Sequence, residues 1–270
     1  MSTKLSKEDV KSPDQVLKTL TQGFQWTRVH STAVIVSLSV FIVIGLGSSL
    51  YGNYIEKKEE RAQELFSQFE KSYLDKKRGF EEADREASRP NLTKEVKATP
   101  KIKASGDLEK DYGAELVGFK KIMDDHAKTK AAQMAALNLS EIYLKYKKTD
   151  EAYLALQKVE PQSQGRDLIS NIVLAQYGDI LSEKGDCKLA IAQWNKVLAK
   201  KEVQFLHDTL RLKSGFCYEK MNEISKAEEL YKKVSQSPQD PQSGEAGLAK
   251  DAEKYLRLLN LKKTAEAKGS

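Results

Sequence analysis

The sequence has few of the residue types that carry chemistry. It contains two cysteines and three histidines, and neither set has the spacing of a metal site. It also lacks the glycine-rich loops that bind the phosphates of nucleotides and dinucleotides. We therefore predict that the protein is not an enzyme, with no catalytic residues, no cofactor, no metal and no small-molecule substrate.

Aromatic residues are scarce, and basic residues are not concentrated. Only 8% of the residues are aromatic, and the net charge of +6 is spread along the chain. A nucleic-acid interface needs a concentrated basic patch with stacking aromatics, so we expect no nucleic-acid partner. Lys, Glu, Ala and Leu dominate the composition, which favours an all-α fold.

One segment lacks charge altogether. No Asp, Glu, Lys or Arg occurs between Arg28 and Glu56. Its apolar centre, residues 32–51, would span about 30 Å as a helix, enough to cross a bilayer. A cleaved signal peptide is the alternative, but the preceding tail of residues 1–31 is long for one. We predict an uncleaved transmembrane helix, whose orientation the flanking Lys and Arg residues leave open.

The chain after this helix divides into four segments. Residues 55–83 have helical periodicity and predict a membrane-proximal helix. Residues 84–107 contain two prolines and few apolar residues, and predict a linker. Helical periodicity returns over residues 108–262, and residues 263–270 are expected to be a flexible tail.

An internal repeat is the strongest signal in the sequence. Residues 139–159, 177–197 and 214–234 align with offsets of 38 and 37 residues. Three sets of aligned positions, here called columns, are expected to pack the helices together. The first holds small residues, the second alanines and the third bulky residues: Ser140, Gly178 and Gly215; Ala152, Ala190 and Ala227; Leu156, Trp194 and Tyr231.

This order of columns resembles the tetratricopeptide repeat, a pair of antiparallel helices of 34 residues. The resemblance implies an α-solenoid with repeats at about 133–166, 171–203 and 208–241, and a capping helix at 244–262. The small residue would let the first helix of a pair approach the second. Residues 55–80 and 108–126 could form an incomplete pair before the first repeat.

The turn inside each pair carries a second pattern. Gly185 and Asn222 occupy matching positions and suit a left-handed helix end, because both tolerate positive φ. Lys147 stands at the equivalent position of the first repeat. We therefore expect a less regular turn there.

The resemblance also implies a groove lined by the first helix of each repeat. Carried onto this sequence, its residues are Met134, Leu137, Glu141, Leu144, Ile172, Ala175, Asp179, Ser182, Thr209, Leu212, Phe216 and Glu219. Such a groove is mixed apolar and acidic, which favours extended apolar or basic segments of partner proteins. Alternatively, several of these residues only pack against the neighbouring helix.

Cys187 and Cys217 allow two interpretations. A disulfide between neighbouring repeats is possible in an oxidising compartment. Two free thiols are the prediction, because nothing in the sequence places the two side chains together.

The arrangement as a whole resembles the YfgM-like family of bacterial inner-membrane proteins. The similarity is carried by "DQV" (14–16), the single anchor, and the repeat stretch "GDILSEKGDCKLAIAQWNKVL". It implies an ancillary subunit of the Sec translocon, with a cytoplasmic N-terminus and periplasmic repeats. Its partners would be translocon subunits, a membrane-anchored chaperone or unfolded clients. A scaffold of another envelope machine (outer-membrane assembly, division or a pilus) and a cytosol-facing repeat receptor remain alternatives.

Overall fold

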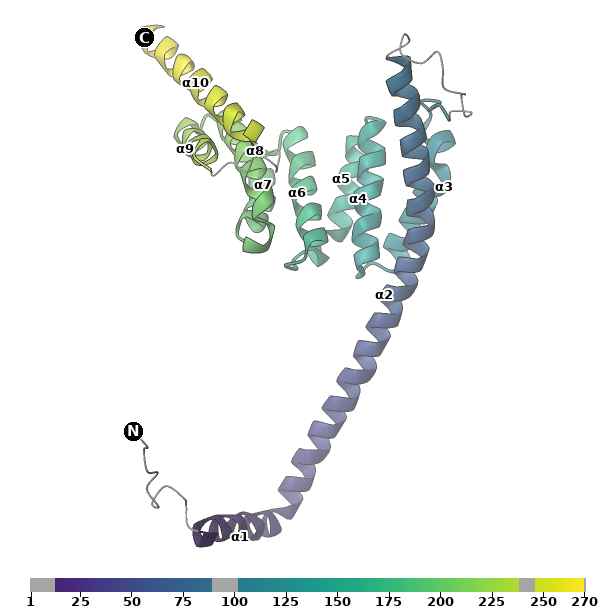
Figure 1. Cartoon of the computed structure of the whole chain (residues 1–270), viewed down its shortest axis with the longest axis vertical. Helices are drawn as coiled ribbons and strands as arrows, with labels where there is room; N and C mark the ends of the chain where they lie inside the picture. Colours follow the sequence, from purple (N-terminus) through teal and green to yellow (C-terminus); the bar gives the residue numbers. More distant parts are fainter. Residues whose placement is uncertain (1–12, 89–101, 238–245, 270) are drawn as a thin grey trace, which may run out of the picture. The chain divides into compact units, whose positions relative to one another are not determined.

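The computed structural model describes residues 13–88, 102–237 and 246–269. Helices account for nearly all of these residues, and no β-strand occurs among them (Figure 1). Contacts divide the chain into two units at Lys57 and Lys58, which we describe separately.

The first unit contains α1 (Pro13–Val29) and the apolar part of α2 (Ser31–Ala87). Within the described residues, α2 is the one helix that is long and apolar enough to cross a membrane. The two helices expected at 32–51 and 55–83 are one continuous helix, which corrects the prediction of separate elements. Gly52 lies between them, but one glycine costs a helix only about 1 kcal/mol.

The second unit is a series of helix pairs. After the end of α2 come the following helices: α3 (Leu108–Asp125), α4 (Lys130–Lys145), α5 (Thr149–Val159), α6 (Leu168–Glu183), α7 (Cys187–Leu198), α8 (His207–Lys220), α9 (Ile224–Ser235) and α10 (Ala246–Gly269). Short 3₁₀ turns at Glu160–Gln162 and Lys201–Leu206 connect successive repeats. Three pairs, α4 with α5, α6 with α7 and α8 with α9, correspond to the three repeats.

A fourth pair precedes the first repeat, formed by α2 and α3. The Phe66 and Phe119 rings lie 5.8 Å apart, and Lys76 Nζ pairs with the buried Glu115 carboxylate at 2.8 Å. A Cβ added to Gly118 of α3 would lie 2.4 Å from the Phe69 ring of α2. The small residue is therefore on the second helix of this pair, whereas the three repeats carry it on the first.

The expected linker at 84–107 is shorter than predicted. Helix α2 continues through Ala87, and the backbone amides of Ser105 and Gly106 donate to the Asp111 carboxylate on α3. Residues 89–101 lie outside the described part of the chain.

The two helices of each repeat cross closely, which explains why the sequence has small residues at the positions of the small column. A Cβ on Gly178 would lie 2.4 Å from Trp194 Nε1, and one on Gly215 would lie 2.4 Å from the Tyr231 ring. Ser140 occupies the same column in α4 and is fully buried. The alanine column is likewise buried, as are the bulky residues opposite: Ala152, Ala190 and Ala227; Leu156, Trp194 and Tyr231.

The turns within the pairs are alike in all three repeats. Lys147, Gly185 and Asn222 have φ values of 57°, 90° and 60°. In each, the amide of the next residue donates at 2.8 Å to a carbonyl in the last turn of the first helix. The expectation of an irregular turn at Lys147 is therefore wrong. Because this hydrogen bond and the helix packing define the turn, lysine adopts a conformation that costs it about 1–2 kcal/mol.

We expect Lys147→Gly to raise the free energy of unfolding by about 0.5 kcal/mol. Glycine removes the left-handed strain, and its extra entropy in the unfolded chain cancels part of the gain. The reverse exchange, Gly185→Lys, should lower the free energy of unfolding at the equivalent turn. Urea unfolding followed by circular dichroism measures both, and a destabilising Lys147→Gly would contradict the assigned turn.

Two further predictions are corrected by the second unit. Cys187 and Cys217 form a disulfide between α7 and α8, with 5.2 Å between their Cα atoms, so the prediction of free thiols is wrong. The residues are 30 apart in sequence, and only the packing of neighbouring repeats brings them together. The expected flexible tail at 263–270 is helical through Gly269, as the last part of α10.

Candidate functional site

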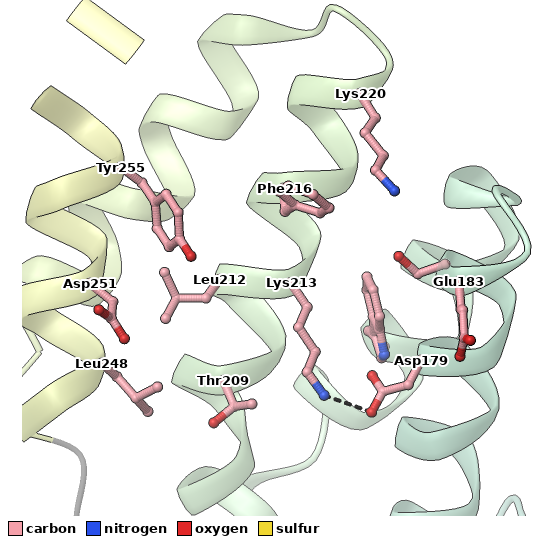
Figure 2. Close-up of a pocket in the computed structure, with 12 residues that line it drawn as sticks. Asp179, Glu183, Thr209, Leu212, Lys213, Phe216, Lys220, Leu248, Asp251 and Tyr255 are labelled. Carbon is pink, nitrogen blue, oxygen red and sulfur yellow. Dashed lines mark hydrogen bonds and ion pairs between the residues drawn. The ribbon is translucent and has the colours of Figure 1, made fainter. Parts of the chain in front are cut away.

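A pocket of about 580 Å³ lies on the second unit where α6, α8 and α10 meet (Figure 2). Helix α8 supplies one wall with Thr209, Leu212 and Phe216. Helices α6 and α10 supply the others, and Trp194 of α7 also contributes. The pocket is thus formed mainly by the helices in the first position of their pairs.

The pocket exposes an apolar surface. The Phe216 side chain is 50% exposed and Tyr255 is 37% exposed, while Leu212 and Leu248 are half-buried beside them. Leu212 packs on one side against the cluster of Ala227, Tyr231 and Leu259, and Tyr255 stacks on Tyr231 of α9, yet Phe216 and Tyr255 stay exposed within the described chain. Exposed aromatic surface of this kind is typical of a binding site for another protein.

Charged groups surround this surface. Lys213 Nζ pairs with Asp179 Oδ2 at 2.6 Å, linking α8 to α6 (Figure 2). Lys220 Nζ lies 4.8 Å from the centre of the Phe216 ring, within cation–π range. Glu183 and Asp251 also line the pocket, and neither forms an ion pair with a described residue.

Contacts behind the pocket hold α10 in place. The Tyr231 hydroxyl donates to Glu219 Oε1 at 2.7 Å, and Lys262 Nζ approaches the other oxygen of Glu219 at 3.1 Å. The Tyr231 and Tyr255 rings stack with their centres 5.4 Å apart. Burial, together with the hydrogen bond to Glu219, raises the pKa of Tyr231, so the hydroxyl stays a donor at neutral pH.

The structure brings together part of the predicted groove. Five of its residues line the pocket: Asp179, Ser182, Thr209, Leu212 and Phe216. Glu219 is engaged by Tyr231 and Lys262 instead. The members from the first repeat lie elsewhere, where Met134, Leu137 and Leu144 pack against the core and Glu141 pairs with Lys77. Of the others, Ala175 packs against the core and accepts a hydrogen bond from Trp194 Nε1 at 3.1 Å, and Ile172 is half-buried on α6.

Sequence reasoning missed the wall formed by α10. Its contributions to the pocket are Leu248, Asp251 and Tyr255. A signal was present in the sequence: Ala252 lies 37 residues after Gly215 of the small column, and Tyr255 lies 37 residues after Tyr218, which is three residues beyond Gly215. Helix α10 thus has the sequence register of the first helix of a further repeat, besides being a cap.

A comparison with models of protein families assigns the chain to a family. Residues 25–236 match the model of the tetratricopeptide repeat-like domain. The chain belongs to this family. Its repeats are typically non-enzymatic modules for protein–protein interaction, so the chain is an α-helical repeat protein of the interaction type.

Two crystal structures of MamA are similar to the chain. They are 19% and 20% identical to it in sequence, each with a TM-score of 0.40. The matches cover 62% and 60% of this chain, and 99% and 90% of the MamA chains. A search of curated proteins found no match.

Proposed function

We propose that the protein is a membrane-anchored adaptor that docks partner proteins in the pocket between α6, α8 and α10. In this proposal residues 32–51 cross the bacterial inner membrane, residues 1–31 are cytoplasmic and the repeats are periplasmic. The partner is a subunit of the Sec translocon, a membrane-anchored chaperone or a newly translocated protein.

The observation that carries the proposal is the half-exposed Phe216 in an open pocket of about 580 Å³. Phe216 belongs to a group of exposed and half-buried apolar side chains with Leu212, Leu248 and Tyr255, and grouped apolar surface of this kind is typical of a binding site. The family supports the same conclusion, since its repeats are protein-interaction modules.

Two observations support the location. The uncharged segment of α2 has the length and hydropathy of a membrane span. The Cys187–Cys217 disulfide favours an oxidising compartment, because cytosolic proteins rarely keep structural disulfides. This second point favours the periplasm over a cytosol-facing receptor.

Photo-crosslinking tests the docking. We expect p-benzoylphenylalanine at position 216 to capture translocon or chaperone components in living cells. The same residue at Phe205 is a matched control, because this ring is 55% exposed on a 3₁₀ turn away from the pocket. Equal capture from both positions, or none from 216, would contradict the proposal. Capture of a different envelope complex would favour the alternative scaffold.

Labelling with a membrane-impermeant thiol reagent tests the topology. In intact spheroplasts we expect Gln204→Cys to react and Lys18→Cys to react only after lysis. Both side chains are exposed, so protection by folding does not account for a difference. The opposite pattern would place the repeats in the cytosol.

A further inference from the structure

The pocket between α6, α8 and α10 has a charge opposite to that of the whole chain. Its lining contains three carboxylates, Asp179, Glu183 and Asp251, against the two ammonium groups of Lys213 and Lys220. The chain carries a net charge of +6. A pocket of net negative charge in a basic protein attracts a partner with positive charge.

The charged side chains of the pocket differ in whether they are paired and in where they lie. Lys213 is neutralised by Asp179 at 2.6 Å, and Glu183 lies on the same side of the pocket as Lys220 (Figure 2). Asp251 projects from α10 beside Leu212 and Tyr255, and it forms no ion pair with a described residue. Glu183 and Asp251 are therefore the two pocket carboxylates without an ion pair to a described residue, and Asp251 is the one beside Leu212 and Tyr255.

We propose that this pocket binds an extended polypeptide segment in which a large apolar side chain lies beside an arginine or lysine. The apolar side chain packs on Phe216 and Leu212, and the basic group pairs with Asp251. This inference rests on the proposed adaptor function and adds the chemistry of the bound segment.

Helix α10 makes this specificity possible. Without it, the groove would keep Phe216 and Leu212 but lose Asp251, Tyr255 and Leu248. Stacking of Tyr255 on Tyr231 and the ion pair from Lys262 to Glu219 hold α10 against the last repeat. The acidic wall is therefore placed by the same contacts that close the series of helices.

The test measures binding of fluorescent Gly/Ser nonapeptides to the full-length protein in detergent. Three probes carry a central Leu–Arg, Leu–Glu or Ser–Arg pair. We expect the Leu–Arg peptide to bind tightest, and added salt to weaken its binding. Equal affinity for the Leu–Arg and Leu–Glu peptides would overturn the assignment of a basic partner. Equal affinity for the Leu–Arg and Ser–Arg peptides would overturn the apolar contact.

Charge reversal locates the contact. Asp251→Lys should weaken binding of the Leu–Arg peptide by about fivefold and improve binding of the Leu–Glu peptide. Glu253→Lys makes the same change in net charge on an exposed position of α10 outside the pocket, and should change neither affinity. Equal effects of the two variants would overturn the role of Asp251.

The outcomes separate this inference from the adaptor function. If crosslinks from position 216 capture a partner while the peptides show no preference for arginine, the adaptor function stands and the basic specificity fails. If neither crosslinks nor peptides give binding, both proposals fail.

Discussion

Trp194→Ala is expected to lower the free energy of unfolding by about 3–5 kcal/mol, the usual cost of removing a fully buried aromatic side chain. Trp194 is 1% exposed and lies against Gly178, where α6 and α7 cross. Its indole N–H also donates to the Ala175 carbonyl at 3.1 Å. Urea unfolding of the full-length protein in detergent, followed by circular dichroism, measures the loss. Trp26→Ala, at a 59% exposed ring, is the control and should have little effect.

The same crossing predicts a coupling between Trp194 and Gly178. Gly178→Ala alone should destabilise by about 1–3 kcal/mol, because its Cβ would lie 2.4 Å from the indole nitrogen and overpack the crossing. In the Trp194→Ala background the space is open, and the better helix propensity of alanine should make the second change neutral or stabilising by up to about 1 kcal/mol. A double-mutant cycle without coupling would contradict the assigned crossing.

Loss of the Cys187–Cys217 disulfide should lower the free energy of unfolding by about 3–4 kcal/mol. The cross-link restricts the unfolded chain to a closed loop, and this is the loss of chain entropy expected for a loop of 30 residues. The bond closes a loop of 30 residues and joins the second repeat to the third. The double variant Cys187→Ala/Cys217→Ala removes the bond and the sulfur atoms together. Both side chains are buried, so part of its effect is lost packing.

Reduction of the unmodified protein separates the two contributions. A reductant breaks the bond and leaves both sulfur atoms in place, so its effect measures the cross-link alone. Under reducing conditions, the difference that remains between wild type and the double variant then measures the packing of the sulfur atoms. Identical urea midpoints for oxidised and reduced wild type would contradict a stabilising disulfide.

Part of the candidate site was predictable from the sequence because the pattern of residues that packs each helix pair repeats along the chain. The small, alanine and bulky columns recur with nearly constant offsets, and each column has one packing role in a helix pair. Phe216, Leu212 and Asp179 followed from that register, and they line the pocket. Residues predicted from the first repeat do not, because α2 and the core contact that part of the surface.

The sequence by itself determined the helical class, the uncharged segment and the repeat, since these depend on composition and periodicity along the chain. Only the tertiary structure decided the disulfide, the regular turn at Lys147 and the contacts that place α10 against the last repeat. Cys187 and Cys217 become neighbours through repeat stacking, and Lys147 accepts a strained φ because the surrounding helices define its turn. Asp251 lines the pocket because Tyr255 stacks on Tyr231, a contact between helices that no local pattern contains.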